Sequence, residues 1–242
     1  MLKYSDTYRV RISDSDVNGF LKLPSFLQMM QELAKDHAEV LGVGSSTLMP
    51  QGLGWALAKL RLDIDRLPTC GERVCIKTWA STRTKVTTER EFVLSDEMGD
   101  PVATARTMWI LFDLNKRRLE RLDTLGDWLR TDEFASEFKF SDMPQPPDKD
   151  ALYTSNFGVR KDDLDINQHV NNAIYLTWAL EPVPDVFYKT HHPKNMEVWF
   201  LSEVFRGQRL DSVCSIEGLR SFHSIVCESK ERARVNIEWI NA

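Results

Sequence analysis

The sequence predicts an α+β fold in which one plan, a long helix wrapped by a curved antiparallel sheet, occurs twice in tandem. Three observations predict it: an early helix with an apolar stripe, a run of strand-like segments after it, and a return of the same order after a polar stretch. With 242 residues, 42% of them hydrophobic, the chain is long enough for one large or two ordinary domains with proper cores.

The first half is expected to contain one strand, one long helix and then four more strands. Alternating apolar and basic residues indicate a strand over 4–12, and Pro24 suits the first turn of the helix that follows. That helix carries its apolar residues on one face and is expected to end near Gly42. The later strands are expected over 55–67, 73–82, 86–95 and 102–114.

A polar, proline-containing stretch over 131–150 is interpreted as a linker. It separates an N-terminal unit, 1–130, from a C-terminal unit, 151–242. The second unit repeats residues of the first in order, at shifts that shrink from 149 to 130 positions as its connections shorten. The matched pairs are Arg11 with Arg160, Asp16 with Asp165, Asn18 with Asn167, Glu32 with Glu181, Gly71 with Gly207, and Trp109 with Trp239.

The two copies differ at positions that could carry chemistry. His169 corresponds to Phe20, and Glu203 corresponds to Leu67. The ionisable groups therefore belong to the C-terminal copy, which predicts that this copy is the active one and that the other is adapted to something apolar. Because Asp165 has a counterpart in the first copy, it is interpreted as either a structural residue of its turn or a catalytic one.

The segment 165–172, Asp-Ile-Asn-Gln-His-Val-Asn-Asn, precedes an apolar, helix-favouring stretch over 173–180. Asn171 or Asn172 can cap that helix by accepting one of its unpaired N–H groups. His169 then lies just before a helix N-terminus, where N–H groups and the positive end of the helix dipole can stabilise an oxyanion.

This segment, with Tyr175, Trp178 and Glu181 after it, resembles the signature of acyl-acyl carrier protein thioesterases. Segments 55–59 and 63–68 are similar to the N-terminal half of that family. The resemblance implies a double hotdog fold, two copies of a helix wrapped by an antiparallel sheet. It also implies hydrolysis of fatty acyl thioesters on acyl carrier protein, with release of the free fatty acid.

By the same resemblance the catalytic residues are Asp165, Asn167, His169 and Glu203. Plant members place a Cys after that Glu, where this chain has Val204. The sequence also lacks their organelle-targeting extension, so it is more similar to a bacterial, cytoplasmic member of the family.

The residues suit water attack on a thioester. The carbonyl is electrophilic and the thiolate leaves readily, so the site must supply a base and an oxyanion site. Glu203 or His169 can serve as the base and Asn167 can hold the water or the carbonyl, but which acid does what stays open. No metal or other cofactor is required, and a metal site at the His191-His192 pair, expected in a loop, is disfavoured.

The first copy is expected to bind a medium or long acyl chain, since burying each methylene gains about 0.8 kcal/mol. Its candidate substrate-binding residues lie on or near the first helix and the strand after it. They are Phe20, Met29, Met30, Leu33 and Trp55.

Composition limits the partners and the compartment. The formal charge of −5 gives no case for nucleic-acid binding, and no apolar run is long enough to cross a membrane. The four cysteines lack C-x-x-C spacing and are interpreted as reduced, mostly buried thiols of a cytoplasmic protein. Acyl carrier protein is acidic, and two basic clusters could receive it: Lys116, Arg117, Arg118 and Arg121 form one, and Lys230, Arg232 and Arg234 the other.

Two other functions stay open. An acyl-CoA thioesterase would use the same site, and a non-enzymatic acyl sensor could share the fold. The pair of His169 and Glu203 favours an enzyme, because a pure binder needs neither. Chain-length and saturation preference, the donor carrier and the oligomeric state, a homodimer included, are not determined by the sequence.

Overall fold

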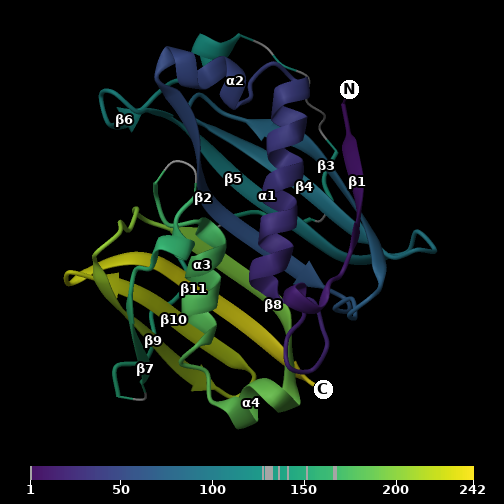
Figure 1. Cartoon of the computed structure of the whole chain (residues 1–242), viewed down its shortest axis with the longest axis vertical. Coiled ribbons are helices and arrows are strands. Elements are labelled where there is room, and N and C mark those ends of the chain that lie inside the picture. The colour runs from purple at the N-terminus through teal and green to yellow at the C-terminus, as the bar shows by residue number, and fades with distance from the viewer. Residues whose placement is uncertain are drawn as a thin grey trace. The chain divides into compact units, whose positions relative to one another are not determined.

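The computed structural model describes residues 2–126, 128, 133–135, 137–140, 142–150, 152–165 and 168–242. The chain forms two compact units, Met1–Lys139 and Phe140–Ala242, and the division falls inside the predicted linker. In each unit a helix runs across the strands of an antiparallel sheet (Figure 1).

The first unit has its strands in the order β1-β3-β4-β5-β2, with the short β6 paired to β5. The apolar stripe of α1 is buried, including Met30 and Leu33, and Gly42 adopts a φ of 76° just after the helix ends. The elements are β1 (Tyr4–Arg9), α1 (Leu23–Val40), α2 (Ser45–Leu48), β2 (Leu53–Ile64), β3 (Arg73–Arg83), β4 (Thr87–Ser95), β5 (Pro101–Asp113) and β6 (Arg118–Leu119).

The second unit has the corresponding order, β7-β9-β10-β11-β8. Its elements are β7 (Tyr153–Gly158), α3 (Asn172–Leu180), α4 (Asp185–Thr190), β8 (His191–Phe200), β9 (Arg209–Glu217), β10 (Arg220–Cys227) and β11 (Lys230–Asn241).

The strand register supports the internal repeat residue by residue. Partners in the first sheet map onto partners in the second at the predicted shifts of 149, 136 and 130 positions. The matching pairs are Tyr8 opposite Val74 with Phe157 opposite Leu210, and Leu57 opposite Trp109 with Pro193 opposite Trp239. The Trp109–Trp239 match is therefore a true structural equivalence.

Helix α3 occupies the predicted stretch 173–180 and begins one residue earlier, at Asn172. It has 9 residues against 18 in α1, because Pro182 and Pro184 follow and proline cannot continue a helix, so the second copy of the plan has the shorter helix. One expectation about the second unit is wrong. His191 and His192 lie in β8 rather than in a loop. Pro193 is accommodated in β8 because the register between β8 and β11 shifts next to its partner, Trp239. A proline is tolerated at such an irregularity.

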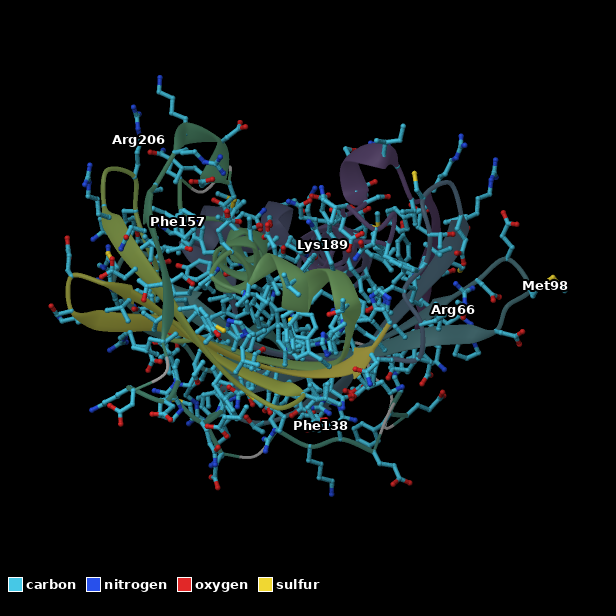
Figure 2. The ribbon with its side chains drawn as sticks, turned by 90° about the horizontal axis from the view of Figure 1, so that it is seen from below. Arg66, Met98, Phe138, Phe157, Lys189 and Arg206 are labelled. Atoms are coloured by element: carbon cyan, nitrogen blue, oxygen red, sulfur yellow. The ribbon has the colours of Figure 1, made fainter. Side chains whose placement is uncertain are left out.

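The described part of the predicted linker packs against the sheets. In the first unit the indole N–H of Trp79 donates to the carbonyl of Glu133 at 2.8 Å, and the guanidinium of Arg61 covers the ring of Phe138. Figure 2 shows Phe138 on the outer side of the strands. In the second unit Arg234 donates to the carbonyl of Pro144 at 3.0 Å. A polar composition did not reveal these contacts.

Candidate active site

The segment around His169 forms a tight turn ahead of α3. The amide of Asp165 donates to the carbonyl of His169 at 2.8 Å, and the amide of Gln168 donates to the carbonyl of Asp165 at 3.0 Å. The carboxylate of Asp165 accepts the amide of His169 at 3.2 Å. Asp165 therefore closes the turn from within, and the direction in which His169 leaves the backbone depends on it.

The first unit contains the same turn. Asp16 donates to the carbonyl of Phe20 at 2.8 Å, Gly19 donates to the carbonyl of Asp16 at 3.0 Å, and Asp16 Oδ1 accepts the amide of Phe20 at 3.0 Å. Gly19 has a φ of 83°, and Gln168 adopts the corresponding left-handed φ of 65°. Phe20 thus occupies in the first unit the position that His169 occupies in the second.

His169 and Glu203 come together in the second unit. Nδ1 of His169 lies 3.1 Å from Oε1 of Glu203, and the two side chains are 34% and 47% exposed. A carboxylate on Nδ1 fixes the orientation of an imidazole and leaves Nε2 for proton transfer. The structure therefore brings together two of the four predicted catalytic side chains, and Asp165 supports the turn that carries His169. Asn167, the fourth, lies outside the described residues.

Glu203 follows β8 on a segment that is held from several sides. The amides of Leu201 and Ser202 donate to the carbonyl of Arg232 at 2.8 and 3.2 Å, and the hydroxyl of Tyr175 donates to the carbonyl of Ser202 at 3.3 Å. Burial raises the pKa of the Tyr175 hydroxyl, so that group stays a hydrogen-bond donor. These contacts fix where the Glu203 backbone lies.

The side chain of Arg232 supports the same segment. Its Nη1 donates to Ser202 Oγ at 3.1 Å and to the carbonyl of Glu203 at 3.4 Å, and the side chain is only 13% exposed. Arg234 is 17% exposed and pairs with Glu231. Two of the three cations of the second basic cluster, Arg232 and Arg234, therefore make contacts within the unit. The sequence missed this role because only the register of β11 beside β8 brings Arg232 to the site.

The start of α3 is capped as predicted. Asn171 is the cap: its side chain accepts the amide of Ala173 at 2.9 Å, and its carbonyl accepts the amide of Ile174 at 2.9 Å. Its own amide donates to the carbonyl of Asp163. Within the described segment 168–174, the amide of Asn172 is the one to which the structure gives no acceptor.

The predicted substrate-binding residues all lie in the first unit, at different depths. Met30 and Leu33 lie on the buried face of α1, whereas Phe20 and Met29 are half-buried. Trp55 donates its indole N–H to the carbonyl of Val43 at 2.9 Å and packs against a buried leucine cluster. That cluster is Leu48, Leu53, Leu111 and Leu122.

The four cysteines form no disulfide. Cys214 is buried, and this burial raises the pKa of its thiol to about 12, so it holds its proton at neutral pH. Cys227 is buried on β10, and Cys70 and Cys75 belong to the first unit. Among the described residues, no three His, Cys, Asp or Glu side chains gather as a metal-binding group. No described helix is long and apolar enough to cross a membrane.

Comparison with known proteins identifies the family. The acyl-ACP thioesterase N-terminal domain model matches residues 1–124, and the acyl-ACP thioesterase C-terminal domain model matches residues 147–241. The chloroplastic oleoyl-acyl carrier protein thioesterase 2 of Arabidopsis thaliana is 26% identical over 239 residues. That match covers 88% of this chain and 63% of the plant protein, so the chain spans less than two thirds of the relative.

Two solved structures share the fold. The 12:0-ACP thioesterase from Umbellularia californica superposes with a TM-score of 0.91 at 23% identity, covering 100% of this chain and 98% of that one. An acyl-ACP thioesterase from Bacteroides thetaiotaomicron gives a TM-score of 0.88 at 22% identity, covering 98% of each chain. These likenesses confirm the predicted α+β double hotdog fold. Together with the two domain matches, they establish that the chain belongs to the acyl-ACP thioesterase family.

Proposed function

We propose that this chain hydrolyses fatty acyl thioesters carried on acyl carrier protein and releases the free fatty acid. The observation that carries the proposal is the pairing of His169 with Glu203 at 3.1 Å, ahead of α3. The first unit has Phe20 and Leu67 in the corresponding places, so it keeps the turn without the reactive groups. The family supplies the substrate class, since plant relatives are named an oleoyl-acyl carrier protein thioesterase and a dodecanoyl-[acyl-carrier-protein] hydrolase.

Water attacks the thioester carbonyl directly in the proposed mechanism. Nε2 of His169 takes a proton from the water as its oxygen bonds to the carbonyl carbon, and Glu203 holds the imidazole through Nδ1. The tetrahedral intermediate then collapses, the C–S bond breaks, and the proton passes to the departing thiolate. Glu203 acting as the base itself is the alternative within the same site.

The oxyanion of that intermediate needs hydrogen-bond donors. The amide of Asn172, at the first position of α3, is the proposed backbone donor, because its neighbours in the described turn already have acceptors. Asn167 is proposed, from the family resemblance, to hold the water or the carbonyl. Asp165 is proposed to keep the turn in shape.

No cysteine takes part in this route. A Cys nucleophile must be a thiolate within reach of the base, whereas the pKa of buried Cys214 is raised and Val204 follows Glu203. An acyl group trapped on any cysteine during turnover would contradict direct water attack.

The first unit is proposed to hold the acyl chain with Phe20, Met29, Met30, Leu33 and Trp55.

The exposed cluster of Lys116, Arg117, Arg118 and Arg121, around β6, is the proposed contact for the acidic carrier protein. The reaction is proposed to take place in the cytoplasm, and fractionation of the source cells tests this.

One assay separates the candidate functions. Acyl chains of increasing length are offered on acyl carrier protein and on CoA, at low and high salt. We expect hydrolysis of medium or long chains, faster on carrier protein at low salt, because salt screens the contact between opposite charges. Equal or better turnover of acyl-CoA at every salt concentration would make the chain an acyl-CoA thioesterase, and binding without turnover would make it a sensor.

A further inference from the structure

Phe205 lies against the imidazole of His169. The two ring centroids are 5.4 Å apart and the ring planes meet at 84°, which is the edge-to-face arrangement that aromatic pairs favour. Phe205 is 37% exposed and His169 is 34% exposed. The contact is therefore at the accessible side of the site, beside the ring that the proposed mechanism uses.

The backbone holds Phe205 in this place through a tight turn. Its amide donates to Oε1 of Gln208 at 2.8 Å, and the amide of Gln208 donates back to its carbonyl at 3.3 Å. The first unit has the same turn, in which Thr69 donates to the carboxylate of Glu72 at 3.0 Å and accepts its amide at 3.1 Å. The neighbouring Arg206 points outward from the second unit (Figure 2). Phe205 thus has a fixed platform that does not depend on the ring contact.

The two units use this pair of positions differently. In the first unit Phe20 bridges to Thr69, and the corresponding positions in the second unit are 169 and 205. In the first unit the small hydroxyl residue Thr69 lies opposite Phe20. In the second unit the aromatic Phe205 lies against His169. The shared fold therefore does not require an aromatic ring at this position, and the ring is present only in the unit that has the imidazole.

We propose that Phe205 is a positioning residue that sets the orientation of the His169 imidazole; this rests on the proposed function. The last side-chain torsion of histidine is broad and roughly two-fold. Rotation of the ring about that torsion would take Nδ1 out of line with Glu203 and turn Nε2 away from the place where the proton is transferred. Packing against Phe205 holds the plane of the ring, and the contact with Glu203 then selects the orientation with Nδ1 on the carboxylate, so the ring needs no reorientation before each proton transfer.

The test compares Phe205→Leu, which keeps an apolar side chain without the ring, with the conservative Phe205→Tyr. For Phe205→Leu we expect kcat to fall about fivefold to tenfold, because the energy of one aromatic contact corresponds to a rate factor of that size. KM should stay within about twofold of wild type. Phe205→Tyr should restore kcat to within about twofold. Leu219→Ala, at a similarly exposed apolar residue in the β9–β10 hairpin, is the matched control and should leave both constants unchanged.

A second measurement does not depend on turnover. Nitrogen-15 NMR of the His169 ring should show one protonated, hydrogen-bonded Nδ1 in the wild type and in Phe205→Tyr, and a mixed signal in Phe205→Leu. If the wild type hydrolyses no acyl thioester, the proposed function fails and this signal still decides the positioning. An unchanged kcat and ring signal in folded Phe205→Leu would overturn the inference. So would a KM raised about tenfold at constant kcat, because Phe205 would then be a substrate contact.

Discussion

The proposed chemistry depends on two side chains, His169 and Glu203. Glu203→Gln and His169→Ala are each expected to lower kcat by about 100-fold, the usual scale for losing a general base or its partner. Steady-state hydrolysis of the best acyl substrate measures this. Glu217→Gln, at an exposed carboxylate of the same unit, is the control. Wild-type turnover in Glu203→Gln would remove that residue from the mechanism.

A buried histidine makes the stability of the second unit depend on pH. His223 lies 2.7 Å from Ser221, which accepts the indole N–H of Trp239 at 2.8 Å, and complete burial lowers the pKa of His223 to about 4. In the unfolded chain the same group binds its proton near pH 6.5. Between these values the unfolded state holds more protons, so the free energy of unfolding falls as the pH falls from 6.5 to 4.

The loss is on the order of 3 kcal/mol over that window, from 1.36 kcal/mol per pKa unit. Urea unfolding of the second unit at several pH values measures it. His223→Gln should flatten the dependence, whereas His191→Gln, at a half-buried histidine, should leave the slope as in wild type. Equal slopes in wild type and His223→Gln would show that another group causes the effect.

At the scale of elements, the duplicated turn separates structure from chemistry. Asp16 and Asp165 make the same bonds in their units, so Asp16→Ala and Asp165→Ala are both expected to lower stability by about 1 kcal/mol, the value of a typical hydrogen bond. Only Asp165→Ala should also lower kcat, because only its turn carries the imidazole. Thermal unfolding and kinetics of the two variants together check this, and an equal loss of kcat in both would contradict it.

The sequence predicts elements best where a local pattern sets them. The stripe of α1 and a cap at Asn171 or Asn172 are predicted from spacing alone, and the repeat predicts which half is the active one. The role of Arg232 and the place of Phe205 were missed, because they depend on which strand lies beside which and on a turn 36 residues beyond His169. The stretch predicted for α3, 173–180, agrees with the helix to within one residue, and Pro182 and Pro184 explain why the helix ends there.

At the scale of the whole molecule, the proposed division of labour gives acyl selection to the first unit. Met30→Trp should fill space under α1 and shift hydrolysis toward shorter chains, and Trp55→Ala should open space and allow longer ones. The ratio of kcat/KM across a series of chain lengths measures the shift. Trp199→Phe, on β8 of the second unit, is the control. If neither first-unit variant changed the profile, the chain would have to bind elsewhere.

The retained turn at Asp16 has a consequence for how such a protein can change over generations. The first unit has the carboxylate that closes the turn, whereas Phe20 and Leu67 stand where the second unit has His169 and Glu203. Under the proposed division, substitutions in the first unit can change the shape of its apolar surface without touching the reactive pair. New substrate ranges should accordingly arise by substitutions within Met1–Lys139, and a directed-evolution experiment for altered chain length should collect its mutations there.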